Sequence, residues 1–278
     1  YTTGRIGHHR IVMTSICPVD QVTAATVASR LSSNFPGLKV VFLVGLCGGV
    51  PTDPGGTDML FGDIIIGKSA VQHDFGRVYP DGFSGKTGVE DNPGRQGHRI
   101  RSFVAKLESM DDLIESSIDC HLKTLLPRAG RWKARYPDLH EGPFPTSDYG
   151  PQNYDVEDCP FASECDSHPA STHCEQLRCK LQDIMSQEQF ENQLRRHPII
   201  HFGTIASGDV RIQHANDRNR LHNVADIKGF DVEASAVWEY VPCIPIKGVC
   251  HYVDSPRTEH RETYAAITAT ACAQAIME

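Results

Sequence analysis

The sequence predicts an α/β protein, and three observations support this class. Short continuous apolar runs, typical of buried strands, alternate along the chain with segments whose apolar residues recur at helical spacing. The chain has 278 residues, 40% of them hydrophobic and 22% charged, which suits one large domain or two small ones. No apolar run approaches the roughly 18 residues that a membrane-spanning helix needs, so we expect no membrane contact.

The charge balance argues against a nucleic-acid-binding surface. The formal net charge is -8 at pH 7, whereas such a surface requires clustered Lys and Arg side chains. A small anionic ligand is still compatible with this charge, because the N-terminus of a helix can bind an anion without net positive charge on the protein. We therefore expect a small-molecule partner and no nucleic acid.

The cysteines indicate a reducing environment. Four of the ten, Cys47, Cys243, Cys250 and Cys272, lie in apolar runs and are expected to be buried thiols. Structural disulfides are rare in the cytosol, and no signal peptide is recognisable, so we expect a cytoplasmic protein. Because Tyr1 opens almost directly into a strand-like run, we also expect the chain to be a fragment of a longer protein.

The N-terminal part predicts a turn, a strand, a helix and a central strand. The turn covers residues 1–7, where glycines are frequent, and the strand covers residues 11–14. Residues 23–33 have small and apolar residues at helical spacing. Residues 39–44 form a continuous apolar run, typical of a central strand, which Gly45 is expected to end.

Two adjacent glycines, Gly48 and Gly49, follow that predicted strand. Glycine lets the backbone approach a ligand closely, so the pair suits a binding loop at the end of a strand. An ordinary turn between a strand and a loop explains the same residues, and the pair alone does not separate these two interpretations.

Two more strands and two amphipathic helices are predicted next, at residues 63–67, 71–75, 97–110 and 112–126. His73 and Asp74 lie on the second of these strands, and we assign them a structural role. The composition changes at residues 127–171, which are rich in Pro, Gly, Asp and Ser and lack periodicity. We interpret this segment as a long insertion into a single domain that covers residues 1–278.

A cluster of cysteines and histidines follows the insertion: Cys159, Cys165, His168, His173, Cys174 and Cys179. Zinc sites usually begin with more closely spaced cysteine pairs than these. A loop with unpaired or occasionally bridged thiols is the alternative. We predict no metal site.

The C-terminal part continues the alternation of helices and strands. Residues 174–185 and 186–196 predict helices, and residues 198–205 predict an apolar strand. The small and polar residues that follow this strand, through Asp209, suit the ligand-binding edge of a sheet. Residues 264–277 alternate Ala, Ile and Thr, as expected for a buried terminal helix.

The segment at residues 230–255 carries the most informative pattern. One apolar run ends at Phe230 and another covers residues 244–249, and each is followed by polar groups. Glu233 follows the first run and His251 follows the second. Ligands of α/β proteins bind where strands end, so this carboxylate and imidazole could hold a polyol and protonate a leaving group.

Each of these two residues also has a plainer interpretation. Glu233 could merely begin a helix at residues 234–240, where the helix dipole favours an acidic side chain. His251 could be a packed histidine that is hydrogen-bonded to Asp254 or to a backbone carbonyl.

The chain resembles the nucleoside phosphorylase superfamily, which includes purine and uridine phosphorylases and the methylthioadenosine/S-adenosylhomocysteine nucleosidases. The matching segments span nearly the whole chain in the family's order: residues 1–9, 44–51, 62–66, 71–76, 201–209, 230–235 and 247–255. The resemblance is strongest to a fungal branch that is often N-terminal in NLR-like or ankyrin-repeat proteins. It implies a three-layer α/β/α sandwich around a mixed, partly barrel-like central sheet, with further domains C-terminal to this one.

The resemblance also implies roles for individual residues. Glu233 matches the glutamate that accepts a hydrogen bond from the ribose 2′-hydroxyl, and His251 stands where the family has the aspartate that protonates the base. The other substrate-binding positions carried over are Gly48 and Gly49 on the nucleophile side, Ile205 and Ala206 at the base, Ser207, Asp209, Phe230 beside the base pocket, Val232 under the sugar and Arg5 at the mouth of the site.

The implied reaction is cleavage of the N-glycosidic bond of a purine nucleoside or nucleotide, without a cofactor, in a homo-oligomer. Leu43 and Leu46 stand where the phosphorylases have an Arg and a Ser for phosphate, which favours water as the nucleophile. The strand that supplies a water-activating carboxylate in the nucleosidases would lie upstream of Tyr1. Phosphorolysis, or a nucleoside-binding sensor weakened by His251, are the alternatives.

Overall fold

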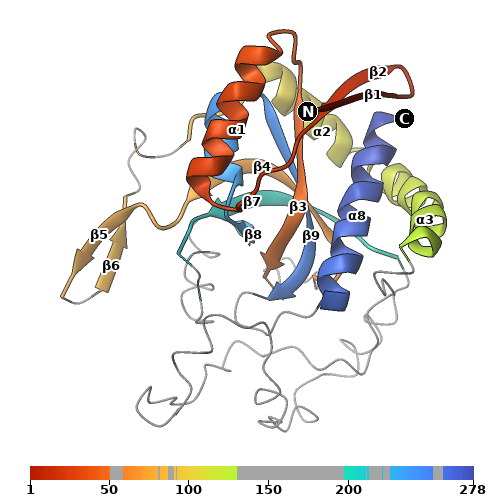
Figure 1. Cartoon of the computed structure of the whole chain (residues 1–278). Coiled ribbons are helices and arrows are strands. Elements are labelled where there is room, and N and C mark those ends of the chain that lie inside the picture. The colour runs from red at the N-terminus through yellow and green to blue at the C-terminus, as the bar shows by residue number, and fades with distance from the viewer. Residues whose placement is uncertain are drawn as a thin grey trace, which may run out of the picture.

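The computed structural model describes residues 1–50, 59–80, 82–86, 91, 93–129, 197–210, 212, 221, 226–252 and 259–278 (Figure 1). The strands lie at β1 Thr2–Ile6, β2 His9–Met13, β3 Val41–Gly49, β4 Ile64–Gln72, β5 Gly76–Tyr79, β6 Gly82–Gly85, β7 Ile200–Ser207, β8 Ile227–Asp231 and β9 Cys243–Tyr252. The helices lie at α1 Gln21–Asn34, α2 His98–Glu108, α3 Asp111–Arg128, α7 Ala234–Tyr240 and α8 Glu259–Met277.

Five strands close into a barrel in the order β3-β8-β7-β4-β9. The pairs β3–β9, β4–β7 and β7–β8 are parallel, whereas β3–β8 and β4–β9 are antiparallel. This mixture confirms the predicted mixed, barrel-like central sheet. β9 is buried along its entire length, which explains why it reads as a nearly continuous apolar run in the sequence.

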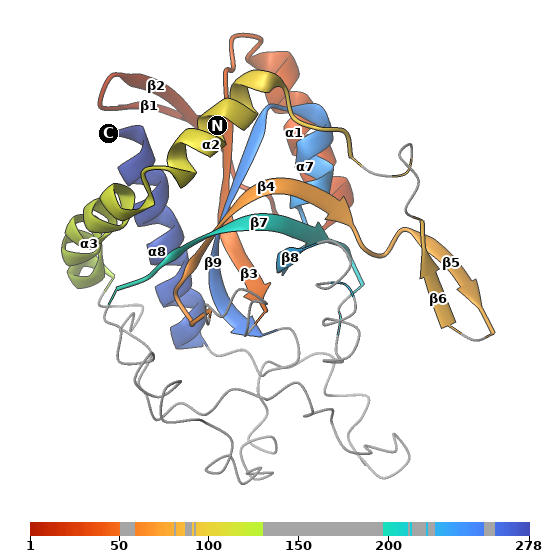
Figure 2. The ribbon, with the colours of Figure 1, turned by 180° about the vertical axis from the view of Figure 1, so that it is seen from behind.

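Helices cover two opposite sides of the barrel, as Figures 1 and 2 show, and confirm the three-layer arrangement. α1 and α7 pack on one side, where Ala24, Ala28 and Trp238 join a core cluster with barrel residues. α2, α3 and α8 pack on the other side, where Ile118 and Cys272 join a second cluster. The barrel wall therefore lies between two apolar layers.

The local sequence accounts for α1. Asp20 precedes the helix in an extended conformation, and its Oδ1 accepts a hydrogen bond from the backbone amide of Thr23 at 2.7 Å. Ala24, Ala28 and Leu31 recur at helical spacing and are buried, so one stripe of the helix faces the barrel. These contacts confirm the predicted helix. The backbone amide of Gln21 donates to Oδ1 of Asp209 at 3.2 Å, which places the N-terminus of the helix near the chain that follows β7.

α8 approaches the barrel more closely than an ordinary helix can. A Cβ atom added at Gly248 of β9 would lie 2.0 Å from the backbone oxygen of Ala265. At Gly62, whose φ is +91°, a Cβ would lie 2.2 Å from the ring of Tyr264. These two glycines therefore allow the backbone of α8 to lie against the sheet.

Two short hairpins lie outside the barrel. β1 and β2 pair with each other around a turn at Gly7, and β5 and β6 form a second hairpin that projects from the molecule (Figure 1). The prediction of a turn at residues 1–7 was therefore wrong, because most of this segment is a strand. Its frequent glycines and polar residues hid a strand that is exposed along nearly its whole length.

Three predicted strands are longer than the sequence suggested. β3 continues past Gly45 to Gly49, because β8 and β9 pair with its glycine-rich end. Residues 63–67 and 71–75 form one strand, β4, whose pairing with β7 shifts register between Gly67 and Ser69. As a result His73 and Asp74 lie just beyond a strand rather than on it.

β9 extends to Tyr252, so His251 lies within a strand and not after it. α3 extends through Pro127 to Arg128, so the predicted insertion begins with helical residues. The remainder of the insertion, the two helices predicted at 174–185 and 186–196, the cysteines at 159, 165, 174 and 179 and the histidines at 168 and 173 lie outside the described residues.

Over the described part of the chain, no helix is long and apolar enough to cross a membrane. The cysteines there, at positions 17, 47, 120, 243, 250 and 272, are free thiols, and Cys47, Cys243, Cys250 and Cys272 are buried as predicted. Within the same residues, no group of three or more His, Cys, Asp and Glu side chains could hold a metal ion.

Candidate active site

Three strands bring the central predicted residues into one row of the barrel. Gly48 of β3 pairs on one side with Phe230 of β8 and on the other side with His251 of β9. Gly49 pairs in the same way with Gly229 and with the residue after His251. Glu233 follows β8 and His251 lies on β9, so the two residues come from strands that are separated by β3.

A buried lysine lies at the centre of this region. Nζ of Lys247 donates a hydrogen bond to Oε2 of Glu233 at 2.9 Å and lies 2.9 Å from Oδ2 of Asp231. The contact with Asp231 is an ion pair without hydrogen-bond geometry. The side chain of Lys247 is 1% exposed and that of Glu233 is 16% exposed, so of this pair the carboxylate is the more accessible to a ligand.

Asp231 is held from its other side by the end of β7. Oγ of Ser207 donates to Oδ1 of Asp231 at 2.6 Å, and the same oxygen accepts from the backbone amide of Ala234 at 3.2 Å. The backbone amide of Ser235 donates in turn to Oγ of Ser207 at 2.9 Å. These bonds fasten the first turn of α7 to β7, so Glu233 stands on a rigid support.

The charges in this cluster set each other's protonation. Burial alone would lower the pKa of Lys247, but attraction to Asp231 and Glu233 outweighs burial and raises the pKa above its usual value. Burial raises the pKa of Asp231 despite the nearby lysine. For Glu233, burial is opposed by the attraction and hydrogen bond of Lys247, and its pKa is lowered. The shift in the pKa of Glu233 therefore favours its ionised form.

The position of Glu233 bears on its plainer interpretation. The residue stands at the N-cap position of α7, but its side chain makes no capping hydrogen bond. The carboxylate is directed to Lys247 instead, across to β9. The main contact of this side chain is therefore with Lys247 and not with the N-terminus of the helix.

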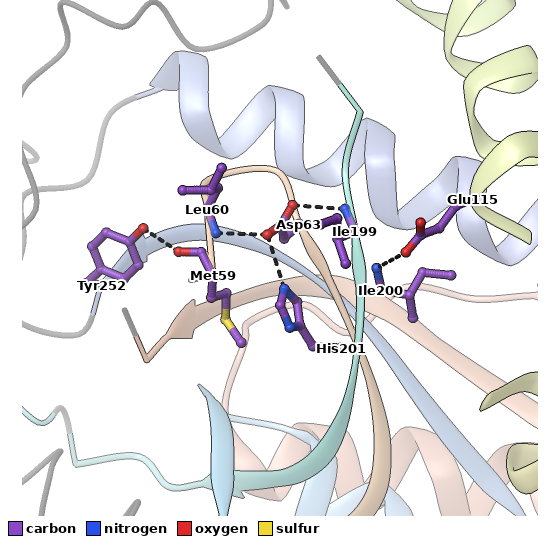
Figure 3. Close-up of polar contacts among 8 residues, drawn as sticks. All are labelled: Met59, Leu60, Asp63, Glu115, Ile199, Ile200, His201 and Tyr252. Atoms are coloured by element: carbon purple, nitrogen blue, oxygen red, sulfur yellow. Dashed lines mark hydrogen bonds and ion pairs between the residues drawn. The ribbon is translucent and has the colours of Figure 1, made fainter. Parts of the chain in front are cut away.

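His251 lies near the end of β9 and is 8% exposed. Its Nδ1 is 3.1 Å from Sγ of Cys250. The end of the strand is anchored by Tyr252, whose hydroxyl donates to the carbonyl of Met59 at 2.6 Å (Figure 3). Asp254, the partner considered in the plainer interpretation of His251, lies outside the described residues.

Phe230 and Asp209 border a second group of polar side chains. The ring of His73 lies edge-on to the ring of Phe230, with centroids 6.2 Å apart, and burial lowers the pKa of His73. The neighbouring Asp74 accepts from the backbone amide of Asp209 at 2.8 Å. Asp209 accepts in turn from the backbone amide of Gln21 at 3.2 Å, which ties the end of β7 to α1.

The remaining predicted residues differ in accessibility. Ile205 and Ala206 are fully buried and pair with β4 and β8 on both sides, so their proposed contact with a base stays a prediction. A Cβ at Gly49 would lie 2.8 Å from Met59 and Val249, so this glycine serves close packing. Val232 is partly exposed between Asp231 and Glu233.

The structure does not bring Arg5 to this region. Arg5 lies in β1, and its Nε donates to the carbonyl of Gly7 at 3.0 Å. Gly7 lies beside Met277 at the C-terminal end of α8. Ala265, which packs against β9, lies roughly 18 Å further back along the axis of that helix. Arg5 is thus placed away from the other predicted site residues.

A buried contact between an aspartate and a histidine was not predicted from the sequence. Asp63 and His201 are 2% and 8% exposed, and Nε2 of His201 lies 3.1 Å from Oδ2 of Asp63 (Figure 3). Asp63 also accepts from the backbone amides of Leu60 and Ile199 at 2.8 and 2.9 Å. Glu115 of α3 likewise accepts from the first amide of β7 at 2.7 Å. These bonds secure the beginning of β4 and β7.

Lys247 was also missed, although the sequence held a signal for it. A lysine inside an otherwise apolar run is rarely buried without an ionic partner. Because Lys247 lies within the strand predicted at residues 244–249, it could have indicated a buried carboxylate nearby. The identity of that carboxylate could not be read from spacing, since Glu233 is 14 residues away in sequence.

Comparison with known proteins identifies the fold. No protein-family model matches the chain. It is 23% identical over 283 residues to an NLR-like protein of Hyaloscypha variabilis, a match that covers all of this chain and 25% of that protein. The chain therefore spans a quarter of the length of this curated relative.

Several solved structures share the architecture. The chain is similar to the 5′-methylthioadenosine/S-adenosylhomocysteine nucleosidase of Neisseria meningitidis in complex with methylthio-immucillin-A, with 14% identity, a TM-score of 0.53 and coverage of 99% of this chain and 83% of that one. The corresponding nucleosidase from S. pneumoniae, with a transition-state inhibitor, is 14% identical, with a TM-score of 0.51 and coverage of 99% of this chain and 84% of that one. The Colwellia psychrerythraea enzyme, in complex with adenine, is 12% identical, with a TM-score of 0.51 and coverage of 99% of this chain and 80% of that one.

Proposed function

We propose that this chain, which has the fold of the nucleoside phosphorylase superfamily, cleaves the N-glycosidic bond of a purine nucleoside or nucleotide by hydrolysis. The observation that carries the proposal is the carboxylate of Glu233, held by buried Lys247 at 2.9 Å. It stands two residues beyond the strand that shares a row of the barrel with His251. The ligands in the similar structures, methylthio-immucillin-A and adenine, support a purine compound as substrate.

Glu233 supplies the grip on the sugar. A carboxylate only accepts hydrogen bonds, and one of its oxygens is engaged by Lys247. The other oxygen can accept from a ribose hydroxyl. When the bond to the base breaks, the sugar gains positive charge, and an adjacent carboxylate that is already ionised stabilises that charge more strongly than it stabilises the neutral substrate.

His251 supplies the proton for the departing base. A base leaves as an anion unless one of its ring nitrogens is protonated, so the reaction needs a general acid. The ordinary pKa of a histidine, about 6.5, suits proton donation near neutral pH. His251 lies on β9 and Glu233 follows β8, and these two strands flank β3 at Gly48, so the sugar and the base would lie on either side of that glycine.

Phosphorolysis and nucleoside binding without cleavage are the two alternatives to hydrolysis. Phosphorolysis needs cationic or polar groups for phosphate near the glycine pair, but Leu43 belongs to the apolar core and Leu46 carries no charge. A sensor that binds a nucleoside without cleaving it is favoured by one feature, the histidine that stands where similar proteins have an acidic general acid.

A base-release assay separates the three functions. The purified protein is incubated with adenosine, inosine, ATP and uridine, with and without inorganic phosphate, and free base is measured by chromatography. We expect purine release without phosphate. Strict dependence on phosphate would support phosphorolysis, and ligand binding without base release would support the sensor.

We expect His251→Ala to lower base release about 100-fold or more, because general acid catalysis contributes about 10²–10⁴-fold to a rate. His251→Asp should retain or raise the rate for adenine compounds, since a carboxylic acid can also donate a proton. The exposed His98 of α2 provides the matched control, and His98→Ala should leave the rate unchanged. A fully active His251→Ala protein would remove His251 from the mechanism.

We expect Glu233→Gln to weaken nucleoside binding and turnover together, by about tenfold or more in kcat/KM, because it removes a charge-assisted hydrogen bond. The exposed Glu239 on the same helix is the control, and Glu239→Gln should behave as the parent protein. Steady-state kinetics with the best purine substrate test both variants. An unchanged kcat/KM for Glu233→Gln would leave this residue with a structural role only.

A further inference from the structure

β9 contains an irregularity next to His251. Cys47 of β3 pairs with Val249, but the next residue, Gly48, pairs with His251. Cys250 is therefore the extra residue of a bulge opposite β3. Bulges redirect side chains and are common beside active sites. Cys250 is 1% exposed, so its thiol is confined to contacts inside the protein.

Two of the contacts of the Cys250 thiol compete for its single proton. Sγ lies 3.1 Å from Nδ1 of His251 and donates to the carbonyl oxygen of Cys47 at 3.5 Å. A thiol carries one proton, which it can donate once, and its sulfur can accept a hydrogen bond. If the thiol donates to the carbonyl of Cys47, the contact with His251 is a hydrogen bond only when Nδ1 carries a proton and donates it to sulfur.

We propose that Cys250 is a positioning residue that keeps a proton on Nδ1 of His251 and thereby makes Nε2 the nitrogen that exchanges a proton with the substrate. This inference rests on the proposed function. The chain of donors runs from Nδ1 to Sγ and from Sγ to the carbonyl oxygen of Cys47. Each polar group in this series of hydrogen bonds then has a partner. This matters because Cys250 is almost completely shielded from water.

The proton balance of the reaction follows from this arrangement. In the charged imidazole both nitrogens carry protons, and Nδ1 is engaged by sulfur. When the N-glycosidic bond breaks, its electron pair leaves with the base, and the proton on Nε2 moves to a ring nitrogen of that base. Water adds its hydroxyl group to the sugar carbon, and its remaining proton returns Nε2 to the charged form. Nδ1 keeps its proton throughout.

The neutral form of His251 therefore has an unusual signature. A neutral histidine with the proton on Nδ1 and none on Nε2 is distinguished by the ¹⁵N chemical shifts of its two ring nitrogens. The measurement uses protein labelled with ¹⁵N-histidine, with the His251 signals identified by their loss in His251→Gln. We expect the Nδ1-protonated tautomer to dominate in the parent protein above the pKa of this histidine.

Two substitutions test the role of the thiol. Cys250→Ala removes the acceptor for Nδ1, so the Nε2-protonated tautomer should gain at least half of the neutral population, and kcat should fall about tenfold with little change in KM, because part of the general acid contribution of about 10²–10⁴-fold is lost. Cys250→Ser keeps one donor and one acceptor and should restore both the tautomer and kcat. Cys243→Ala, which removes another buried thiol of β9, should change neither.

Several results would overturn the inference. One is a dominant Nε2-protonated tautomer in the parent protein, and another is an unchanged tautomer ratio in Cys250→Ala. A loss of kcat that Cys250→Ser does not restore would assign the effect to packing instead. Absence of base release by the parent protein would refute the proposed function, while the tautomer measurement would still decide whether the thiol orders the imidazole.

Discussion

We expect Lys247→Met to lower the free energy of unfolding by about 3–5 kcal/mol, because removing one partner of a buried ion pair leaves uncompensated charge in the interior. Asp231 and Glu233 would both face this cost, since Lys247 is the cation that contacts each of them at 2.9 Å. Stabilities of natural domains are about 5–15 kcal/mol, so this change removes much of the total. Urea denaturation followed by circular dichroism measures the difference.

A surface lysine provides the matched control. Lys68 forms an ion pair with Glu108 at 2.9 Å, but its side chain is 47% exposed. Lys68→Met should cost less than about 1 kcal/mol, because water and salt screen exposed pairs. Adding Asp231→Asn to Lys247→Met should restore part of the lost stability by removing one unpaired carboxylate. If the double variant is no more stable than Lys247→Met, the loss comes from packing and not from charge.

The same substitution connects stability with the proposed reaction. Without Lys247, the pKa of Glu233 loses the attraction and hydrogen bond that lower it, and burial then favours the protonated carboxyl group. A protonated Glu233 is a poorer acceptor for a sugar hydroxyl and does not stabilise a cationic sugar. Lys247→Met protein that remains folded at low temperature should therefore also lose nucleoside binding.

Much of the fold could be predicted because apolar periodicity survives in each element. Residues 23–33, 97–110 and 112–126 predicted helices that are present, and the run at residues 244–249 predicted the core of β9. The errors fall where local sequence and tertiary context disagree. The β3 segment from Gly45 to Gly49 reads as a loop, yet two neighbouring strands hold it extended.

The candidate site could be predicted only in part, for a different physical reason. Glu233 and His251 were found because each follows or ends an apolar run, which is a local signal. Their partners come from long-range contacts: Lys247 reaches back to Glu233, and His201 pairs with Asp63 from 138 residues away. Neither spacing nor composition encodes which buried charges meet when a barrel closes.

We expect Gly248→Ala to destabilise the protein by about 3 kcal/mol or more, since overpacking a core typically costs about 1–3 kcal/mol and backbone here cannot move aside as a flexible side chain can. The added Cβ would lie 2.0 Å from the backbone oxygen of Ala265 and 2.6 Å from its carbonyl carbon. Relief of this contact requires α8 to move away from β9. Thermal unfolding followed by calorimetry measures the loss.

The comparison that isolates the clash is Gly37→Ala. A Cβ at Gly37 would meet no atom within 4 Å, and its backbone does not have a positive φ, so this change should alter the free energy of unfolding by no more than about 0.5 kcal/mol. Because α8 packs against β9 at Gly248, three residues before His251, its displacement by Gly248→Ala should also disturb the end of β9 where His251 lies. We therefore expect Gly248→Ala to lose base release even at temperatures where it stays folded. Equal stabilities of the two variants would show that α8 does not pack against β9 through Gly248.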